Sequence, residues 1–281
     1  MTTGLRRELA AAIAIPIVLA ILFLLPAVAF DLLVAVIALG ALWEFYRLAE
    51  KTGLPVAKVV GTLGGILILS VATLLWSPPA DLYLPGLVLF GAREVAWMFL
   101  GISFLAAVAP LLAGVTPPAA LAGAASTVFG VLSITLPATA ICYLRGFSPR
   151  AVLFLFLIVW GCDSFAFYTG KNFGRRKLAP VLSPNKTWEG TIGGFVGATL
   201  LGAAAGTWWL LPEFGPARGG LAAALASTAG QIGDLVESMW KRGAGVKDSG
   251  VFLPGHGGFY DRIDSLLFAG PVLALFVAVR G

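Results

Sequence analysis

Long stretches without a charged side chain constrain this sequence more than any other feature. The longest, Val95–Leu144, contains no Asp, Glu, Lys or Arg over 50 residues. A helix needs about 20 apolar residues to cross the hydrocarbon core of a bilayer, so this stretch is long enough for two crossings. Charged residues make up only 12% of the 281-residue chain, about half the share usual in soluble domains. We therefore predict an all-α polytopic integral membrane protein.

About nine transmembrane helices are predicted from the uncharged stretches. Gly114–Pro118 divides the longest stretch in two, because proline and glycine end helices. The first apolar run, Leu9–Phe30, has 22 residues without a charge and is longer than the apolar part of a usual signal peptide, which favours a retained helix over a cleaved leader. A loop at the membrane interface is expected at Ser77–Pro85. The predicted spans are Leu9–Leu25, Val28–Leu48, Val59–Trp76, the two parts of Val95–Leu144, Ala151–Gly170, Gly190–Leu211, Gly219–Trp240 and Ile263–Val279.

The distribution of positive charge sets the expected orientation. Cytosolic segments of membrane proteins carry an excess of Lys and Arg. With a cytosolic N-terminus, the inner segments hold 14 of the 19 basic residues and the outer segments hold 5. We therefore expect the C-terminus outside, and the polar loops Lys171–Trp188 and Lys241–Arg262 in the cytosol. The net charge of +5 follows this topology and does not indicate nucleic-acid binding.

Polar chemistry is concentrated in the second half of the chain. Residues 1–149 are nearly featureless apolar helices, which we interpret as a region for scaffolding and dimerisation. Residues 150–281 carry both large polar loops and are predicted to be the catalytic region. Cys142 and Cys162 both lie in apolar spans, so they predict neither a disulfide framework nor a Cys-based metal site.

Two carboxylates lie inside predicted spans. Asp163 precedes Lys171 by eight residues and Asp234 precedes Lys241 by seven. At the helical rise per residue, both lie about 10–12 Å below the cytosolic helix ends. A carboxylate at that depth costs at least a few kcal/mol unless it is paired, hydrated or bound to metal. A functional role is favoured for both, and a structural ion pair with a lysine of a neighbouring helix is the alternative.

Asp234 begins a polar stripe along its helix. Glu237, Ser238 and Lys241 follow it at i+3, i+4 and i+7, which places all four side chains on one helical face. The stripe is predicted to point into a site, although a water-filled cleft would also accommodate it.

Asp261 and Asp264 open the last predicted span. Acidic residues at this place also serve as ordinary N-terminal helix caps. For Asp264, the capping interpretation is as strong as a functional one. Asp261 is interpreted as a metal ligand together with Asp234. Magnesium takes oxygen ligands and usually binds one or two carboxylates plus substrate phosphates.

Two further segments suit phosphate binding. The GHGG turn at Gly255–Gly258 can present backbone N–H groups to an anion, and His256 could orient or protonate a phosphate oxygen, or simply bond to the backbone. SPNKTWEG, Ser183–Gly190, places polar side chains directly before a predicted helix N-terminus, where N–H groups attract phosphate. The basic residues of Lys171–Trp188 are explained equally well by nearby anionic lipid. The sequence contains no Walker A, G-x-S-x-G or H-E-x-x-H motif.

Together these motifs resemble the phosphatidate cytidylyltransferase family, also called CDP-diacylglycerol synthases. SPNKTWEG and Asp163–Gly174 are similar to that family, whereas the first five predicted helices match it only as apolar spans. The most specific part of the resemblance is carried by Ser238, Lys241, Arg242, Lys247, Asp248, His256, Gly257, Gly258, Asp261, Arg262 and Asp264.

The resemblance implies a reaction in which CTP and phosphatidate give CDP-diacylglycerol and pyrophosphate, with magnesium alone or with a second cation. It also implies a homodimer in the plasma (inner) membrane, surrounded by membrane lipids, with its active site facing the cytosol. The nucleophile of this reaction is a largely ionised phosphate, so the difficulty is to bring two anions together. Metal, cations and positioning serve that purpose better than a general base.

The resemblance also suggests residue roles. Magnesium is expected at Asp234 and Asp261. The expected catalytic residues are Asp163, Asp234, Lys241, Arg242, His256 and Asp261. The expected substrate-binding residues are Lys171, Ser183, Asn185, Lys186, Thr187, Glu189, Glu237, Ser238, Lys247, Asp248, Gly257, Gly258, Arg262 and Asp264.

Four other functions are alternatives to this reaction. A polyprenol kinase or an archaeal-type lipid cytidylyltransferase could share a CTP site and differ in the lipid. A transporter would also carry buried carboxylates and broken helices, but the polar groups crowd one predicted end of the membrane and the sequence has no inverted repeat. A CDP-alcohol phosphotransferase is disfavoured, because the D-G-x-x-A-R element of those enzymes is absent.

Overall fold

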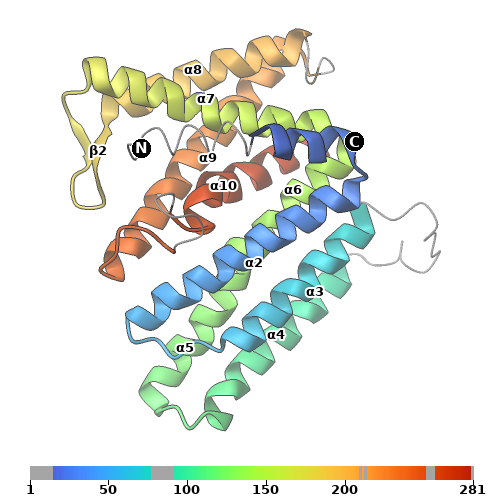
Figure 1. Ribbon diagram of the computed structural model, residues 1–281, viewed down its shortest axis with the longest axis vertical. Coiled ribbons are helices and arrows are strands. Elements are labelled where there is room, and N and C mark those ends of the chain that lie inside the picture. The colour runs from blue at the N-terminus through green and yellow to red at the C-terminus, as the bar shows by residue number, and fades with distance from the viewer. Residues whose placement is uncertain (1–14, 77–91, 209–210, 212–213, 251–256, 280–281) are drawn as a thin grey trace. The chain divides into compact units, whose positions relative to one another are not determined.

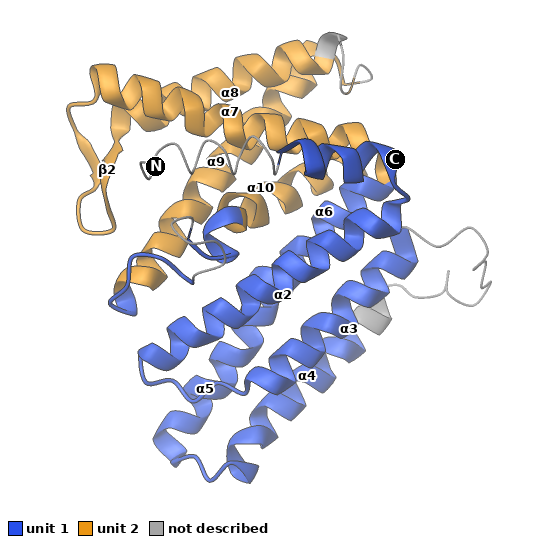
Figure 2. Cartoon of the chain, in the orientation of Figure 1, with its two compact units in different colours: residues 1–146, 243–262 blue, residues 147–242, 263–281 orange. Residues whose placement is uncertain are grey.

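The computed structural model describes residues 15–76, 92–208, 211, 214–250 and 257–279 of the chain (Figure 1). Two compact units are distinguished (Figure 2). Unit 1 comprises Met1–Gly146 and Gly243–Arg262, and unit 2 comprises Phe147–Arg242 and Ile263–Gly281. The first boundary lies three residues from the predicted division at 149/150. Gly243–Arg262, which carries much of the predicted chemistry, groups with the N-terminal helices.

The main helices of unit 1 follow the apolar stretches of the first half of the chain. Its elements are α2 (Ala27–Lys51), α3 (Lys58–Trp76), α4 (Ala92–Leu112), α5 (Pro117–Gly130), the π-helical segment η2 (Val131–Thr135) and α6 (Leu136–Phe147). The chain turns after α2 at Gly53, whose φ of 85° is a conformation that glycine adopts readily.

Tyr46 on α2 is among the largest fully buried side chains of the described residues. Its ring is fully buried and its hydroxyl donates to the carbonyl of Thr127, at 2.8 Å. Gly61 on α3 and Gly130 on α5 lie against this side chain, where an added Cβ would overlap it. Glycine therefore allows α3 and α5 to approach α2 closely, as small residues do between membrane helices.

Unit 2 contains the remaining helices and a hairpin. Its elements are α7 (Pro149–Phe173), β1 (Lys177–Ala179), β2 (Ser183–Thr187), α8 (Trp188–Trp208), α9 (Gly215–Gly243) and α10 (Tyr260–Ala278). The last residue of α9 and the first three residues of α10 fall in unit 1. β1 and β2 pair antiparallel, with Lys177 opposite Thr187.

Glycines also bring the helices of unit 2 together. Gly193 and Gly197 of α8 face Thr169 and Phe165 of α7, and a Cβ at either glycine would overlap the facing side chain. Gly233 of α9 lies in the same way against α10, where a Cβ would come within 2.7 Å of the carbonyl oxygen of Asp264. This close approach sets the positions of the polar groups on α9 and α10.

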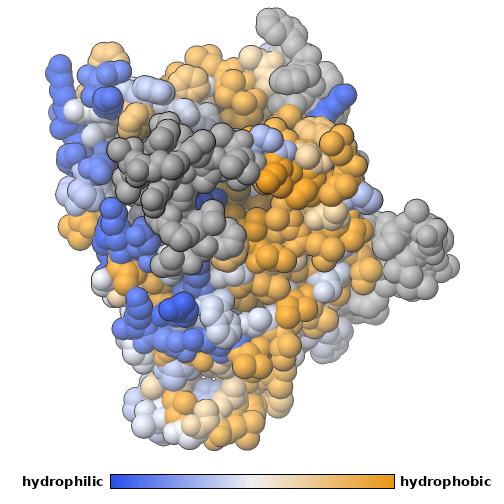
Figure 3. All heavy atoms as spheres, viewed as in Figure 1, coloured by the Kyte–Doolittle hydropathy of each residue, from blue (hydrophilic) through white to orange (hydrophobic). Residues whose placement is uncertain are grey.

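The structure agrees with an all-α membrane protein. Helices occupy the described parts of the predicted spans except for residues at the ends of some of them, such as Leu211, and the chain leaves the helical conformation within the predicted break at Gly114–Pro118. Within the part of the chain that the structure describes, four helical stretches are long and apolar enough to cross a membrane, and they are Ala27–Lys51, Lys58–Trp76, Pro117–Phe147 and Pro149–Phe173. Hydrophobic residues cover much of the face visible in Figure 3. The total of nine spans and the orientation stay predictions.

Two local features do not follow from the apolar pattern. The hairpin β1–β2 lies within Lys171–Trp188, which the sequence predicts as a polar loop. The all-α prediction is therefore wrong for this short segment. The π-helical segment η2 comes just before Pro137, which cannot donate the helical bond to the carbonyl of Ser133. The predicted interface loop at Ser77–Pro85 lies outside the described residues.

Candidate active site

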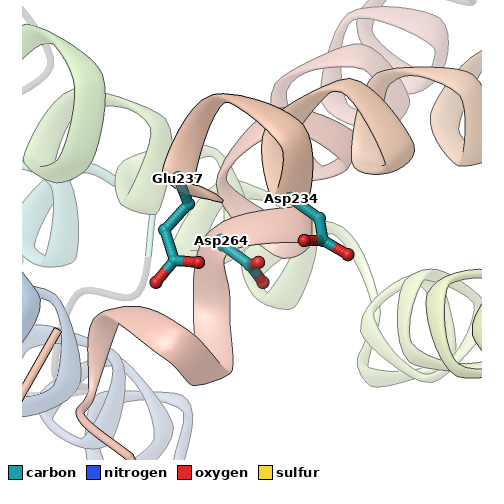
Figure 4. A group of neighbouring side chains, drawn as sticks. All are labelled: Asp234, Glu237 and Asp264. Atoms are coloured by element: carbon teal, nitrogen blue, oxygen red, sulfur yellow. The ribbon is translucent and has the colours of Figure 1, made fainter. Parts of the chain in front are cut away.

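Three carboxylates of unit 2 converge at one place (Figure 4). Asp234 and Glu237 come from α9 and Asp264 comes from the first turns of α10, and one oxygen of each lies within 4.8 Å of the others. Asp264 lies between the other two in this view. The close packing of α9 on α10 at Gly233 brings them together. Hard divalent cations such as Mg²⁺ prefer oxygen ligands of this kind, so the donor set fits such an ion.

Lysines contact two of these carboxylates. Lys186 of β2 places its Nζ 2.6 Å from Oδ2 of Asp234, and Lys241 of α9 places its Nζ 2.5 Å from Oε2 of Glu237. The Glu237 side chain is 1% exposed and that of Lys241 is 12% exposed, so this pair is shielded from solvent. Two of the three carboxylates thus each contact an ammonium group. Such a mixture of charges suits a site that holds both a metal ion and phosphate groups.

The hairpin is fixed to α9 at two points. Lys186 contacts Asp234 as described, and the Nε of Arg242 donates to the carbonyl of Leu182 at the hairpin turn, at 3.2 Å. The SPNKTWEG segment and the polar stripe of α9, which are far apart in the sequence, therefore meet in the fold. Ser238 lies at the edge of hydrogen-bond distance from Asp234, at 3.5 Å.

Thr187 connects the hairpin to α8. Its Oγ1 accepts a hydrogen bond from the backbone N–H of Gly190 at 3.1 Å, which is the N-cap arrangement for a helix that begins at Trp188. The side chain of Thr187 is buried, and it also lies against Gly170 and Gly174 of the preceding segment. Its role in the structure is thus to start α8 directly beside Lys186.

We expect Thr187→Ala to destabilise the protein by about 1 kcal/mol, because the first turn of α8 loses its side-chain acceptor. Thermal unfolding of the detergent-solubilised protein should shift down by about 2 °C. Thr187→Ser keeps the hydroxyl and serves as the control. Equal unfolding midpoints for the Ala and Ser variants would contradict the capping role.

Glu189 holds the start of the hairpin. Its carboxylate accepts from the backbone N–H of Arg175 at 3.0 Å and from that of Arg176 at 3.2 Å. The Arg175 hydrogen bond is the main reason that the pKa of Glu189 lies below its ordinary value. Because the folded-state pKa is lowered, this contribution to stability is complete above the ordinary carboxyl range and is lost as the pH falls through the lowered pKa. The nucleotide-binding role predicted for Glu189 stays a prediction.

Asp163 lies on the same unit as the carboxylate cluster. Its side chain on α7 is exposed and interacts electrostatically with Asp234 and Lys186. The lysine partner of Asp234, Lys186, lies in β2, whereas the structural alternative placed such a lysine on a neighbouring helix. Lys171 lies near the end of the same helix, with its Nζ 5.9 Å from the centre of the Phe167 ring.

A second polar cluster is formed in unit 1 around Asp261. Its Oδ2 accepts from the backbone N–H of Gly258 at 2.7 Å and from the N–H and hydroxyl of Ser249, both at 2.9 Å. Glu44 of α2 joins this cluster, because the same Ser249 hydroxyl also lies 2.8 Å from its Oε2 and can donate to either carboxylate, one at a time. The metal-binding role of Asp261 stays a prediction, and the structure adds an organising role for the surrounding loop.

The sequence interpretation missed Glu44. Its signal was present, because Glu44 lies within the predicted span Val28–Leu48, where a carboxylate requires a partner just as Asp163 and Asp234 do. Asp31 in the same span is also fully buried, and it interacts with Cys142.

The predicted site residues are distributed over both units. His256 lies outside the described residues. Gly257 has a φ of 75° and lies beside Asp261. Unit 1 holds Lys247, Asp248, Gly257, Gly258, Asp261 and Arg262. Unit 2 holds Asp163, Lys171, Ser183, Asn185, Lys186, Thr187, Glu189, Asp234, Glu237, Ser238, Lys241, Arg242 and Asp264.

Comparisons with known proteins point to one family. The profile described as the cytidylyltransferase family matches residues 5–280. A phosphatidate cytidylyltransferase of Brucella abortus is 44% identical over 158 residues, which cover 54% of each chain. The phosphatidate cytidylyltransferase of Haemophilus influenzae is 42% identical over 134 residues, which cover 44% of each chain. That of Staphylococcus epidermidis is 44% identical over 135 residues, which cover 46% of this chain and 49% of the relative. The matched segments thus span about half the length of these curated relatives.

Proposed function

This chain belongs to the cytidylyltransferase family, and we propose that it transfers the cytidylyl group of CTP to phosphatidate. An oxygen of the phosphatidate phosphate forms a bond to the α-phosphorus of CTP. The bond from that phosphorus to the β-phosphate bridging oxygen breaks, and pyrophosphate leaves with the electron pair. The products are CDP-diacylglycerol and pyrophosphate. Similarity to relatives named phosphatidate cytidylyltransferase supports this choice of substrates.

The observation that carries the proposal is the carboxylate cluster with its lysines. Asp234, Glu237 and Asp264 provide oxygen ligands within 4.8 Å of one another, while Lys186 and Lys241 add positive charge at the same place. A reaction between two polyanions needs both kinds of group, since its main barrier is charge repulsion and orientation.

Asp234, Glu237 and Asp264 would hold magnesium, with Asp261 retained as a further predicted ligand. Bound magnesium would supply positive charge to the phosphates of CTP. Lys186 and Lys241 are proposed to bind phosphate oxygens, and their carboxylate partners keep the ammonium groups in place. Arg242 orients the hairpin through its contact with Leu182, so it positions Lys186 as well as adding charge. Lys247, His256 and Arg262 are retained as proposed phosphate-binding residues.

The lipid substrate implies a setting for the enzyme. We propose that the protein is a multi-pass protein of the plasma membrane, that its active site faces the cytosol and that it forms a homodimer. The four helices able to cross a membrane and the excess of basic residues on the predicted inner segments support the first two proposals. Asp163 and Asp234 on predicted spans would place the reaction near the bilayer, within reach of phosphatidate.

The direct test is to incubate the purified protein in detergent with CTP, phosphatidate and magnesium. We expect equimolar CDP-diacylglycerol and pyrophosphate, no product without phosphatidate, and loss of turnover with a chelator that added magnesium reverses. If CTP is consumed only when a polyprenol or another lipid is supplied, that lipid and not phosphatidate is the substrate. Substrate transport across reconstituted vesicles without CTP turnover would overturn the enzyme proposal.

A further inference from the structure

We propose that Glu44, on α2 in the apolar first half of the chain, is a positioning residue for the polar loop that carries Ser249, Gly258 and Asp261. This inference rests on the proposed function, because it assigns a part of the reaction machinery to a helix that the sequence interpretation treated as scaffold. The contacts that carry it all lie within unit 1.

Glu44 is a buried carboxylate held by donors from a distant part of the chain. It is 7% exposed, and its two oxygens accept from the Ser249 hydroxyl at 2.8 Å and from the backbone N–H groups of Phe259 and Tyr260 at 3.1 and 2.9 Å. These partners lie 205 to 216 positions away in the sequence. A buried carboxylate with charge-assisted hydrogen bonds of this kind fixes its donors firmly.

The two N–H groups belong to the start of α10. The first N–H groups of a helix have no partner within the helix, and the helix N-terminus carries partial positive charge. α10 begins at Tyr260, so Glu44 caps it from another helix. Glu44 therefore helps to fix where α10 begins and how Asp261, in its first turn, is oriented.

Ser249 connects Glu44 to Asp261. Its hydroxyl lies 2.8 Å from Oε2 of Glu44 and 2.9 Å from Oδ2 of Asp261. A hydroxyl has a single proton, so it can donate to only one of the two carboxylates at a time, and the Ser249 N–H supplies Asp261 with a second bond. The two carboxylates share one donor and are coupled through it.

The loop is shaped to fit Glu44. A Cβ at Gly250 or Gly258 would overlap the Glu44 carboxylate, so any larger residue at either position would displace it. On the same helix, a Cβ at Gly40 would come within 2.6 Å of the Phe259 ring. The described residues at both ends of the loop thus fit closely against α2, at Glu44 and, one helical turn before it, at Gly40. In the sequence, Ser249 and Gly258 flank the segment that includes His256, so Glu44 and Asp261 hold residues at both of its ends.

The test compares Glu44→Gln with Glu50→Gln in the full-length protein. Glu50 is a matched control, since it lies on the same helix and pairs with Lys58 instead of the loop. We expect Glu44→Gln to lower kcat by about 10- to 100-fold per folded molecule, with little change in KM for CTP. Glu50→Gln should match the wild type in both parameters. Glu44→Asp, which keeps the charge on a shorter side chain, should recover part of the lost kcat.

A second measurement does not depend on turnover. Amide hydrogen exchange at Phe259 and Tyr260 should be faster in Glu44→Gln than in the wild type and unchanged in Glu50→Gln, because Glu44 accepts from those two N–H groups. Ser249→Ala should lower kcat as well, and its effect should not add to that of Glu44→Gln.

The outcomes separate the positioning role from the proposed function. Wild-type protein that makes no CDP-diacylglycerol would overturn the function and with it the positioning role, while hydrogen exchange would still report whether the contact exists. An active wild type with unchanged exchange in Glu44→Gln would overturn the contact. Faster exchange with unchanged kcat per folded molecule would show that Glu44 only stabilises the fold, which would also overturn the proposal.

Discussion

Asp234→Asn should reduce kcat by about 10²–10³-fold and should leave the protein folded. Asp234 is the residue at which the acidic cluster and the hairpin meet, since it lies within 4.8 Å of Glu237 and Asp264 and contacts Lys186. The substitution removes one negative charge from the predicted metal site and the partner that holds Lys186 in place. The magnesium concentration needed for half-maximal activity should therefore rise as well. Steady-state assays over a magnesium series measure both effects.

Stability should change little in this variant. The Asp234 side chain is 33% exposed, and ion pairs with that degree of exposure contribute at most about 1 kcal/mol. Glu50→Gln breaks the ion pair with Lys58, in which the Glu50 side chain is 43% exposed, so it is a matched control for loss of a carboxylate–lysine pair elsewhere. Activity within twofold of the wild type in Asp234→Asn would remove this residue from the site.

Asp261→Asn should also abolish turnover while the protein still folds. Two causes act in the same direction, namely loss of a predicted metal ligand and disturbance of the loop. The carboxylate oxygen Oδ2 accepts from the backbone N–H groups of Ser249 and Gly258, and it shares the single proton of the Ser249 hydroxyl with Glu44. If the asparagine turns its NH2 group toward these donors, it cannot accept their hydrogen bonds. If it turns its carbonyl oxygen toward them, it accepts but lacks the negative charge. We expect a loss of at least about 10²-fold in kcat.

Binding of Mn²⁺ as a magnesium substitute separates the two causes. If Asp261 is a metal ligand, Asp261→Asn weakens Mn²⁺ binding measured by electron paramagnetic resonance. If it acts only on the loop, Mn²⁺ binding matches the wild type, while hydrogen exchange near Gly258 and Ser249 becomes faster. Retained activity would exclude both roles. Ser249→Ala provides the comparison, since it removes one donor to Asp261 and keeps the carboxylate.

Some parts of the candidate site could be predicted and others could not. Asp234, Glu237 and Lys241 were recognised as a stripe because their spacing matches one face of a helix, and Lys241 and Glu237 do form an ion pair. The contact between Lys186 and Asp234 joins two segments 48 positions apart, and nothing local to either segment encodes it. Asp264 could equally have been an ordinary helix cap, and only the packing of α9 on α10 brings it beside Asp234.

The hairpin and Glu44 show why pattern reasoning stops where it does. β1 and β2 are short and polar, and KLA and SPNKT lack the alternation of apolar and polar residues that predicts a strand. Glu44 lies in a span that was assigned from its apolar character, and its partners are more than 200 positions away. In both cases part of the stabilisation is non-local, from Asp234 and Arg242 of α9 for the hairpin and from the start of α10 for Glu44.

The sequence by itself determined the helices, the membrane class and the chemical character of the polar segments. Apolar side chains exclude water from a spanning segment, so its backbone must satisfy its own hydrogen bonds and the helix follows directly from composition and length. Which carboxylates and lysines meet was decided only by the tertiary structure. That choice depends on the rotation and close approach of whole helices, set by contacts such as those at Gly193 and Gly233, and these contacts exist only once the chain has packed.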